Sequence, residues 1–363
     1  MSGRITPSSS IPTPARSASP GRADAGSARR RGLRALAAGI PLRAACVAVA
    51  LGLAGVAFGP AARAQADYPN RTIRFVVTFP SGGAPDTLAR IFAEKAQMGQ
   101  PVVVDNKPGA GGNIGSEMVA KSPADGYTLL LGTVGTHAIN GALYPKLPYD
   151  PVKDFSPITL LALTPNLLVI NKDLPVHSVK ELIDYGKQNP GKLSFGSSGI
   201  GTSIHLSGEL FKIMTGVQMT HIPYKGRQMA IPDLVGGQIQ MIFDNMPSAL
   251  PLVKEDKLRA LGVTTAVRSP AAPEIPTIAE SGVPGFDATS WFAVYTTANV
   301  PAPIVDKLNR EFRRVFALPD VQERLKTNGL EPKLGSPADL AAFQAGETAK
   351  WTKVVKESGA KVE

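Results

Sequence analysis

A short unit consisting of an apolar strand, a Gly/Ser-rich loop and a helix start occurs twice in this chain. The first copy runs from residues 74–79 (RFVVTF) through residues 80–85 (PSGGAP) into a helical pattern that begins at Asp86. The second copy runs from residues 192–195 (KLSF) through residues 196–202 (GSSGIGT) into another helical pattern. A helix start leaves backbone N–H groups unpaired and carries the positive end of the helix dipole. The repeated unit therefore predicts an anion held between two halves of the chain.

Short apolar runs bounded by Gly, Pro, Asn or Asp alternate with helix-period stretches along much of the chain. These runs include residues 102–104, 128–131, 158–163, 167–170, 193–195, 241–243, 260–263 and 292–295. Strands that alternate with helices indicate an α/β architecture with mostly parallel sheets. We therefore predict two α/β lobes with a ligand cleft between them.

The chain must cross twice between two such lobes, and the predicted crossover strands are residues 167–170 and residues 290–295. Lobe 1 is then discontinuous and comprises residues 67–168 and 295–363, whereas lobe 2 comprises residues 169–294. Three helical segments follow the second crossing without an intervening strand. These segments predict a cap that packs on lobe 1.

Residues 1–66 are predicted to be a disordered extension followed by a secretory signal peptide. Three arginines at residues 29–31 precede an apolar stretch at residues 44–58, and Ala64 and Ala66 offer cleavage sites. The apolar stretch is shorter than the roughly 18–20 residues that a membrane-spanning helix requires. The expected location of the protein is therefore the periplasm.

The leader also carries most of the positive charge of the chain. The whole chain has a formal net charge of +10, but nine arginines and a single acidic residue lie in residues 1–64, which leaves a net charge of +2 for the rest. That balance argues against nucleic-acid binding, which requires a strongly basic surface. Cys46, the only cysteine, also lies in the leader, so no disulfide and no thiolate chemistry are expected in the remainder.

Two patterns suggest enzyme sites. Residues 109–115 (GAGGNIG) resemble a dinucleotide-binding loop, but the acidic residue required at the end of the next strand is missing, so a tight turn is the expected role. Residues 196–200 (GSSGI) resemble a nucleophile elbow with isoleucine in place of the last glycine. A hydrolase using Ser198 and His205 is the enzymatic alternative, although no acid is assigned to it. We expect a non-enzymatic protein without a cofactor.

Four titratable residues near the loops have two interpretations each. Asp86 falls in the first turn of its helix, where the dipole favours an acid, and it either caps the helix or recognises a ligand's ammonium group. Asp244 follows an apolar strand and has the same two interpretations. His137 and His205 are compatible both with ligand contact and with simple packing. The four histidines of the chain show no metal-ligand spacing, so no metal site is expected.

The candidate ligand-binding residues lie in or beside the two loops and at the ends of neighbouring strands. They are Phe79, Ser81, Gly82, Gly83, Asp86, Thr133, His137, Ser197, Ser198, Gly199, Thr202, His205 and Asp244. Neither loop contains Arg or Lys, so backbone N–H groups and hydroxyls are the expected donors to an anion. Such donors suit a dicarboxylate, a tricarboxylate, an aromatic acid or an acidic amino acid.

Several collinear segments resemble one known family. They include residues 102–115 (VVVDNKPGAGGNIG), 125–130 (DGYTLL), 205–211 (HLSGELF), 223–226 (PYKG) and 247–251 (PSALP). From residue 68 to its end, the chain resembles the Bug-type extracytoplasmic solute receptors of the tripartite tricarboxylate transporter system. The resemblance implies a type II periplasmic-binding-protein fold with two crossover strands. It also implies that the loaded receptor presents a small carboxylated solute to membrane permease subunits, and we expect it to be a monomer.

The resemblance further implies that ligand contacts come from residues 79–86, 133–137 and 197–205. Hinge residues near Ile170 and Trp291 would absorb the change when the lobes close. A receptor that senses its ligand without transporting it is left open as a second alternative. In the first loop this chain has Ala84 and Pro85 where the family usually has glycine followed by Thr or Ser, and Pro85 removes one N–H donor.

Overall fold

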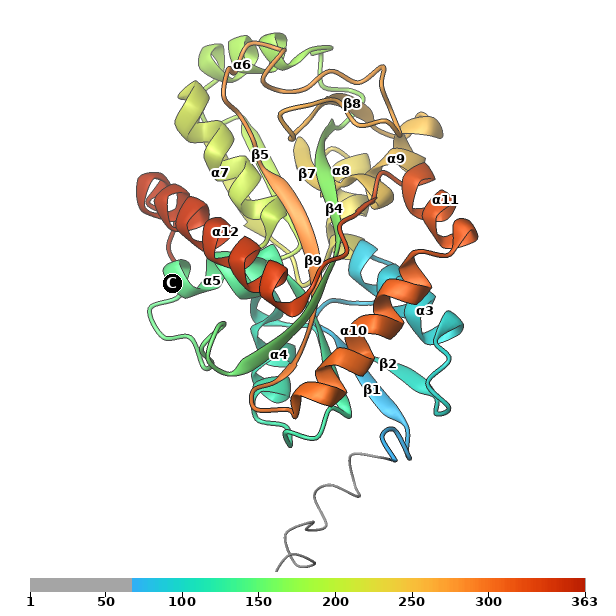
Figure 1. Cartoon of the computed structure of the whole chain (residues 1–363). Helices are drawn as coiled ribbons and strands as arrows, with labels where there is room; N and C mark the ends of the chain where they lie inside the picture. The colour runs from blue at the N-terminus through green and yellow to red at the C-terminus, as the bar shows by residue number, and fades with distance from the viewer. Residues whose placement is uncertain (1–66, 363) are drawn as a thin grey trace, which may run out of the picture. The chain divides into compact units, whose positions relative to one another are not determined.

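The structure of the protein, a computed structural model, describes residues 67–362 (Figure 1). The predicted extension, the signal peptide, its cleavage sites and Cys46 lie outside the described residues. Within residues 67–362, no helix combines the length and the apolar character that crossing a membrane requires. Strands and helices alternate along this part of the chain, as the sequence predicts.

The strands form a mixed sheet whose two ends are each built from parallel strands. At one end, parallel pairing joins β1 (Ile73–Val77) to β2 (Val102–Asn106) and to β3 (Thr128–Thr133). At the other end, parallel pairing joins β5 (Leu193–Ser197) to β6 (Met219–Pro223) and to β7 (Met241–Asn245). These two ends are the cores of the two predicted α/β halves, referred to below as the β1 half and the β5 half.

A single long strand, β4 (Phe155–Ile170), joins the two halves (Figure 1). Up to Pro165 it pairs antiparallel with β9 (Thr289–Thr297), and from Asn166 onward it pairs antiparallel with β7 and β8 (Arg259–Val263). The strands that pair with β4 therefore change from those of one half of the molecule to those of the other half within a single strand.

The second connection is β9, which lies between β3 and β4 in the sheet. A two-residue strand, β10 (Glu331–Pro332), adds to the side of β4. The predicted crossover segments, residues 167–170 and 290–295, lie in β4 and β9, so the α/β fold with two crossover strands is confirmed. The lobe boundaries after residues 168 and 294 stay a prediction.

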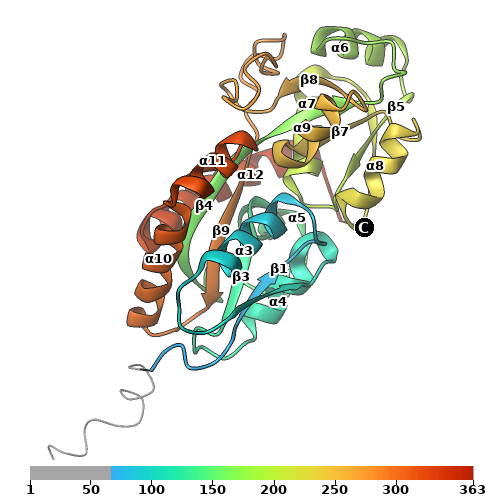
Figure 2. The same cartoon turned by 90° about the vertical axis from the view of Figure 1, so that its right-hand side faces the viewer.

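Helices pack on both faces of the sheet (Figure 2). Their bounds are α3 (Ala84–Lys95), α4 (Asn113–Ala120), α5 (Asn140–Leu143), α6 (Val179–Gln188), α7 (Ser203–Thr215), α8 (Arg227–Val235), α9 (Met246–Lys254), α10 (Ala302–Phe316), α11 (Pro319–Thr327) and α12 (Pro337–Ser358), with a 3₁₀ turn at Ala110–Gly112 and a π-helical turn, η2, at Gly135–Ile139.

Alternation of side chains along β1 shows why both faces need cover. Phe75 packs against Phe92 of α3 and Phe312 of α10, and all three rings are fully buried. The next residue, Val76, points to the opposite face and joins the cluster that contains Val119 of α4. A strand buried on both faces therefore reads as a continuous apolar run in the sequence.

The last helix, α12, contacts both halves of the molecule. It packs against η2 and α5 of the β1 half and against α7 of the β5 half. The Glu347 carboxylate accepts a hydrogen bond from each of the buried indoles of Trp291 and Trp351, at 3.0 Å in both cases. A capping box at Ser336 and Asp339 fixes where this helix begins. The C-terminal segment is thus more than a cap on one half.

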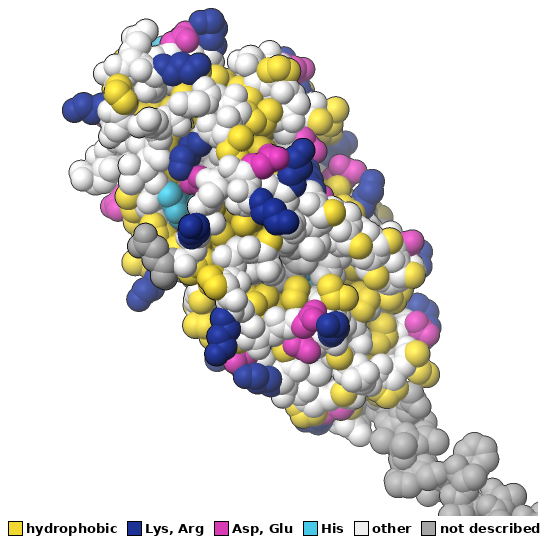
Figure 3. All heavy atoms as spheres, turned by 90° about the vertical axis from the view of Figure 1, so that its left-hand side faces the viewer, with side chains coloured by type: hydrophobic (Ala, Val, Ile, Leu, Met, Phe, Trp, Pro, Cys, Tyr) yellow, Lys and Arg dark blue, Asp and Glu magenta, His cyan; other side chains and the backbone are white. Residues whose placement is uncertain are grey.

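Charged side chains are spread over the face of the molecule in Figure 3 rather than gathered in one region, and both signs are represented. This distribution fits the small net charge that the sequence assigns to the chain after its leader.

Candidate functional site

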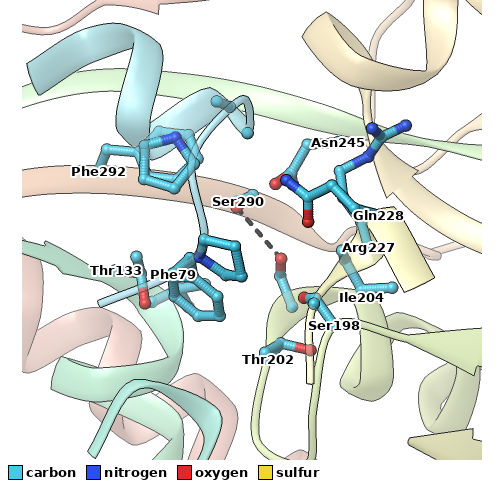
Figure 4. A pocket seen from close by; sticks show the side chains of 17 residues that line it. Phe79, Thr133, Ser198, Thr202, Ile204, Arg227, Gln228, Asn245, Ser290 and Phe292 are labelled. Carbon is cyan, nitrogen blue, oxygen red and sulfur yellow. Dashed lines mark hydrogen bonds between the residues drawn. The ribbon is translucent and has the colours of Figure 1, made fainter. Parts of the chain in front are cut away.

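A small cavity lies where loops of the two halves meet (Figure 4). Its volume is about 40 Å³. A cavity needs at least about 10–15 Å³ to admit one water molecule, so this one admits a group of a few atoms. The β1 half lines it with Phe79, Pro80, Gly83, Ala84, Pro85, Thr133 and Val134, β9 with Ser290 and Phe292, and the β5 half with Ser198, Thr202, Ser203, Ile204, Gly226, Arg227, Gln228 and Asn245.

Four helices begin at this cavity. The N-terminal ends of α3, α7, α8 and α9 contribute lining residues, which are Gly83, Thr202, Gly226 and Asn245 as the four N-cap positions. Each helix start offers unpaired N–H groups and a partial positive charge. Convergence of four such ends on one small space creates a strongly favourable environment for an anionic group.

Five of the thirteen residues predicted from the sequence line the cavity: Phe79, Gly83, Thr133, Ser198 and Thr202. The two Gly/Ser loops are therefore brought together as predicted from their repeated pattern. The hydroxyl of Thr202 also accepts a hydrogen bond from the backbone N–H of His205, which caps α7.

Ser81 and Gly82 lie in the first loop but beside the cavity rather than in its wall. The Ser81 carbonyl accepts a hydrogen bond from the Gln228 side chain, which belongs to the other half. The Gly82 N–H donates to the Asp86 carboxylate at 2.9 Å, and its φ of +84° suits glycine. Both residues shape the loop that carries Gly83.

Asp86 is buried at the start of α3, and its carboxylate is directed at its own loop. It accepts hydrogen bonds from Gly82, from Arg90 at 2.8 Å and from Asn106 at 3.0 Å. Burial alone would raise the pKa of Asp86, but these hydrogen bonds and the Arg90 charge outweigh burial and lower it. The carboxylate thus holds the first loop to the start of α3 through Gly82, and its contact with a ligand stays a prediction.

His137 is fully buried in η2 and does not line the cavity. Its ring stacks on Tyr295 with centroids 3.9 Å apart, and its Nδ1 lies 2.8 Å from the hydroxyl of Thr136. Burial lowers the pKa of His137 to about 3, so the ring is neutral at neutral pH. Its Nε2 has no hydrogen-bond partner within residues 67–362.

Two stacked histidine rings, His205 and His221, lie against the second loop. Ser197 is buried, and its hydroxyl lies 2.7 Å from Nε2 of His221, whose ring stacks on that of His205 at 4.0 Å. The Ser197 hydroxyl also accepts from the N–H of Gly199. Burial lowers the pKa of His205 to about 3 and that of His221 to about 4. His221 was not predicted, because its place beside the loop depends on the pairing of β5 with β6.

The hydrolase alternative is not supported by the geometry of Ser198 and His205. His205 Nδ1 accepts from the N–H of Gly201, and its Nε2 lies 3.9 Å from Glu209. Ser198 lines the cavity but makes no hydrogen bond to a histidine within the described residues. The Ser197–His221 pair has suitable spacing, but Ser197 is only 1% exposed and cannot reach a substrate.

Asp244 is fully buried at the end of β7 and forms an ion pair with Arg227, whose Nε lies 2.8 Å from the carboxylate. Burial raises the pKa of Asp244, although Arg227 pulls it in the opposite direction. Arg227 lines the cavity with its stem, while its guanidinium turns toward α9 and donates to the carbonyl of Ser248 (Figure 4).

Sequence reasoning missed the residues that α8, α9 and β9 bring to the cavity: Arg227, Gln228, Asn245, Ser290 and Phe292. A weak signal was present, because residues 219–223 form a strand and Gly226 precedes a helix. That unit lacks a Gly/Ser run, so it did not stand out. Among the described residues, no cluster of His, Cys, Asp and Glu suits a metal ion.

Known proteins of one family are similar in sequence to this chain. Residues 88–360 match the sequence model of the family described as "Tripartite tricarboxylate transporter family receptor". Protein BugT of Bordetella pertussis is 40% identical over 308 residues, which cover 84% of this chain and 94% of BugT.

Two solved structures with ligands are similar over their whole lengths. Rpa4515 of R. palustris, solved with adipate, has a TM-score of 0.79 and 44% identity, covering 81% of this chain and 99% of that protein. MatC of Rhodopseudomonas palustris, with bound malate, has a TM-score of 0.76 and 35% identity, covering 79% of this chain and 100% of MatC. These similarities confirm the two-lobe fold class predicted from the sequence.

Proposed function

This chain belongs to the tripartite tricarboxylate transporter receptor family, and on that premise we propose that it encloses a small carboxylated solute between its two halves and delivers it to a membrane permease. The observation that carries the proposal is the convergence of four helix N-termini on one cavity. A carboxylate placed there receives backbone N–H groups from both halves at once.

Capture follows from the way the cavity is divided between the halves. Phe79, Gly83 and Thr133 belong to the β1 half, whereas Ser198 and Thr202 belong to the β5 half. Neither half alone encloses a ligand, so the solute binds tightly only when the halves are together. Because β4 and β9 link the halves, small backbone changes along them, including those expected near Ile170 and Trp291, suffice to separate the loops.

Ligand chemistry is supported by two relatives. Adipate and malate, named with Rpa4515 and MatC, are both small dicarboxylates. The cavity of this chain presents backbone donors, hydroxyls and the Gln228 amide, and no acidic side chain lines it. We therefore place carboxylic acids first among candidate solutes and amines last.

The family supports a proposal for location and partners. We propose a periplasmic receptor, secreted with cleavage near Ala64 or Ala66, that acts as a monomer and hands its solute to the permease subunits. Proteins described as periplasmic, such as BugD at 35% identity and a TM-score of 0.78, support the location. No catalytic step is required of any residue in this scheme.

The proposal is tested by thermal unfolding of residues 67–363 against a panel of carboxylates, each paired with its neutral amide. The panel contains adipate, malate, citrate, benzoate and glutamate. A ligand at 100 times its Kd adds about 2.7 kcal/mol of stability, which raises the Tm by roughly 5 °C for a chain of this size. We expect at least one acid to give that shift and its amide to give none.

Native mass spectrometry of the purified chain is the control, because a retained ligand would mask added ones. An empty protein that responds to no acid would contradict carboxylate binding. Equal shifts with an acid and its amide would contradict the role assigned to the helix N-termini.

A further inference from the structure

A second, larger cavity of about 240 Å³ adjoins the first. It is lined by the N-terminal part of α3, by the start of α9 and by α11, so it also lies between the two halves. Gly83, Ala84 and Arg227 line both cavities. We refer to the 40 Å³ space as the inner cavity and to the 240 Å³ space as the outer cavity.

The outer cavity is lined by two arginines, Arg227 and Arg324, and by no acidic side chain. The two arginines differ in their surroundings. Arg227 is mostly buried and is balanced by Asp244, to which its Nε donates, while its Nη2 donates to the Ser248 carbonyl. Arg324, on α11, is exposed, and its guanidinium makes no ion pair or hydrogen bond with residues 67–362.

The net positive charge of the outer cavity therefore comes mainly from Arg324. Two nearby acids are already paired: the Asp86 carboxylate, in the first turn of α3, is engaged by Arg90, Gly82 and Asn106. Asp320, four residues before Arg324 on α11, pairs with Lys95. Arg324 faces an interlobe space with its donors free, whereas a guanidinium recognises a carboxylate through two parallel N–H groups.

The volumes of the two cavities suit different parts of one ligand. The volume of the inner cavity matches a group of a few atoms, such as one carboxylate. The outer cavity is six times larger and is the neighbouring space into which the remainder of a ligand can extend past Gly83 and Arg227.

We propose that the outer cavity is a second anion site, in which Arg324, beside Arg227, binds the distal carboxylate of a solute whose first carboxylate occupies the inner cavity. This site rests on the proposed function, since it needs the inner cavity to bind a carboxylate. It makes the length and the second charge of the solute the basis of selection. Leu325 of α11 packs in the same buried cluster as Phe75 of β1, whereas Arg227 begins α8 of the β5 half. A bridging solute therefore also holds the halves together.

The test compares Arg324→Gln with Lys326→Gln, a substitution that removes the same charge from an exposed position of α11 outside the outer cavity. Isothermal titration measures the Kd of adipate, of longer and shorter straight-chain dicarboxylates, and of their monomethyl esters. We expect Arg324→Gln to weaken the best dicarboxylate by about tenfold, the effect of one charge-assisted contact, and to leave its monoester unchanged. Lys326→Gln should leave both unchanged.

Each other outcome overturns a stated part of the proposal. If monoesters bind as tightly as diacids, or if Arg324→Gln weakens both equally, the outer site is wrong while the inner site stands. If no carboxylate binds the wild-type chain, the proposed function fails and the outer site fails with it. A third arm adds acetate to the monoester complex. If acetate stabilises the monoester complex of the wild type but not that of Arg324→Gln, the outer cavity binds a separate anion. That result would contradict a solute that bridges the two cavities.

Discussion

At the scale of single residues, the pair formed by Arg227 and Asp244 is the most consequential feature of the site. The Asp244 carboxylate is fully buried, and Arg227 is the cation beside it. A buried pair contributes little net stability, but loss of one partner leaves an uncompensated charge in a medium that solvates it poorly. The pair therefore fixes the position of Arg227 at the junction of the inner and outer cavities.

Replacement of Arg227 by Gln is expected to destabilise the chain by about 3–5 kcal/mol at pH 8. Burial already raises the pKa of Asp244 above its unfolded value, and removal of Arg227 raises it further. A raised folded-state pKa means that the folded form gains stability as the pH falls, so the deficit should shrink at pH 5. Urea unfolding at both pH values measures it.

Lys225→Gln is the control for this prediction, since Lys225 is exposed and lies two residues from Arg227. It should change the free energy of unfolding by less than about 0.5 kcal/mol at either pH. A deficit of Arg227→Gln that is the same at pH 5 and pH 8 would contradict a role for the Asp244 charge.

At the scale of elements, the start of α8 lies against the loop that precedes α3. A Cβ placed on Gly226 would come within 2.8 Å of Pro80 Cγ, which belongs to the other half. The φ of Gly226 is 168°, which is extended backbone that alanine also adopts. Glycine is therefore required at position 226 because the two halves approach each other closely there. The local backbone conformation does not require it.

Gly226→Ala is expected to weaken solute binding by about 1–3 kcal/mol, or about 5- to 150-fold, because the added methyl group keeps the halves apart. The free energy of unfolding should change by less than about 1 kcal/mol, since separated halves relieve the clash. Titration calorimetry and urea unfolding measure the two quantities. In the matched control, Gly346→Ala, the new Cβ has no atom within 4 Å apart from its chain neighbours and the backbone of its own helix, and affinity should not change. An unaltered affinity in Gly226→Ala would show that this approach is not needed.

Sequence patterns predicted the parts of the site that are formed by residues adjacent in the chain. They missed the residues that reach the site only through pairing of distant strands. The loops at Gly83 and Ser198 were predictable because strand, loop and helix follow one another directly. Arg227 and Asn245 come to the cavity only because β6 and β7 pair beside β5, and no local signal encodes that pairing. Packing of His137 beneath Tyr295 likewise depends on β9, so the sequence left its role open.

At the scale of the whole described molecule, the two halves share one sheet and one binding region. The change of partners along β4, from β9 up to Pro165 to β7 from Asn166 onward, places the boundary between the halves within a strand. Helix α12 also contacts both halves, through η2 and α5 of the β1 half and through α7 of the β5 half. Motion of the halves must therefore be accommodated by twisting of β4 and β9 and by sliding along α12, which favours a small closure over a large one.

The most direct test of the central claim is a crystal structure of residues 67–363 with the acid that gives the largest thermal shift. We predict one carboxylate in the inner cavity, with its oxygens about 2.7–3.2 Å from backbone N–H groups of both the loop before α3 and the loop before α7. A ligand bound to one half alone, or bound outside the region where the four helices begin, would contradict the claim.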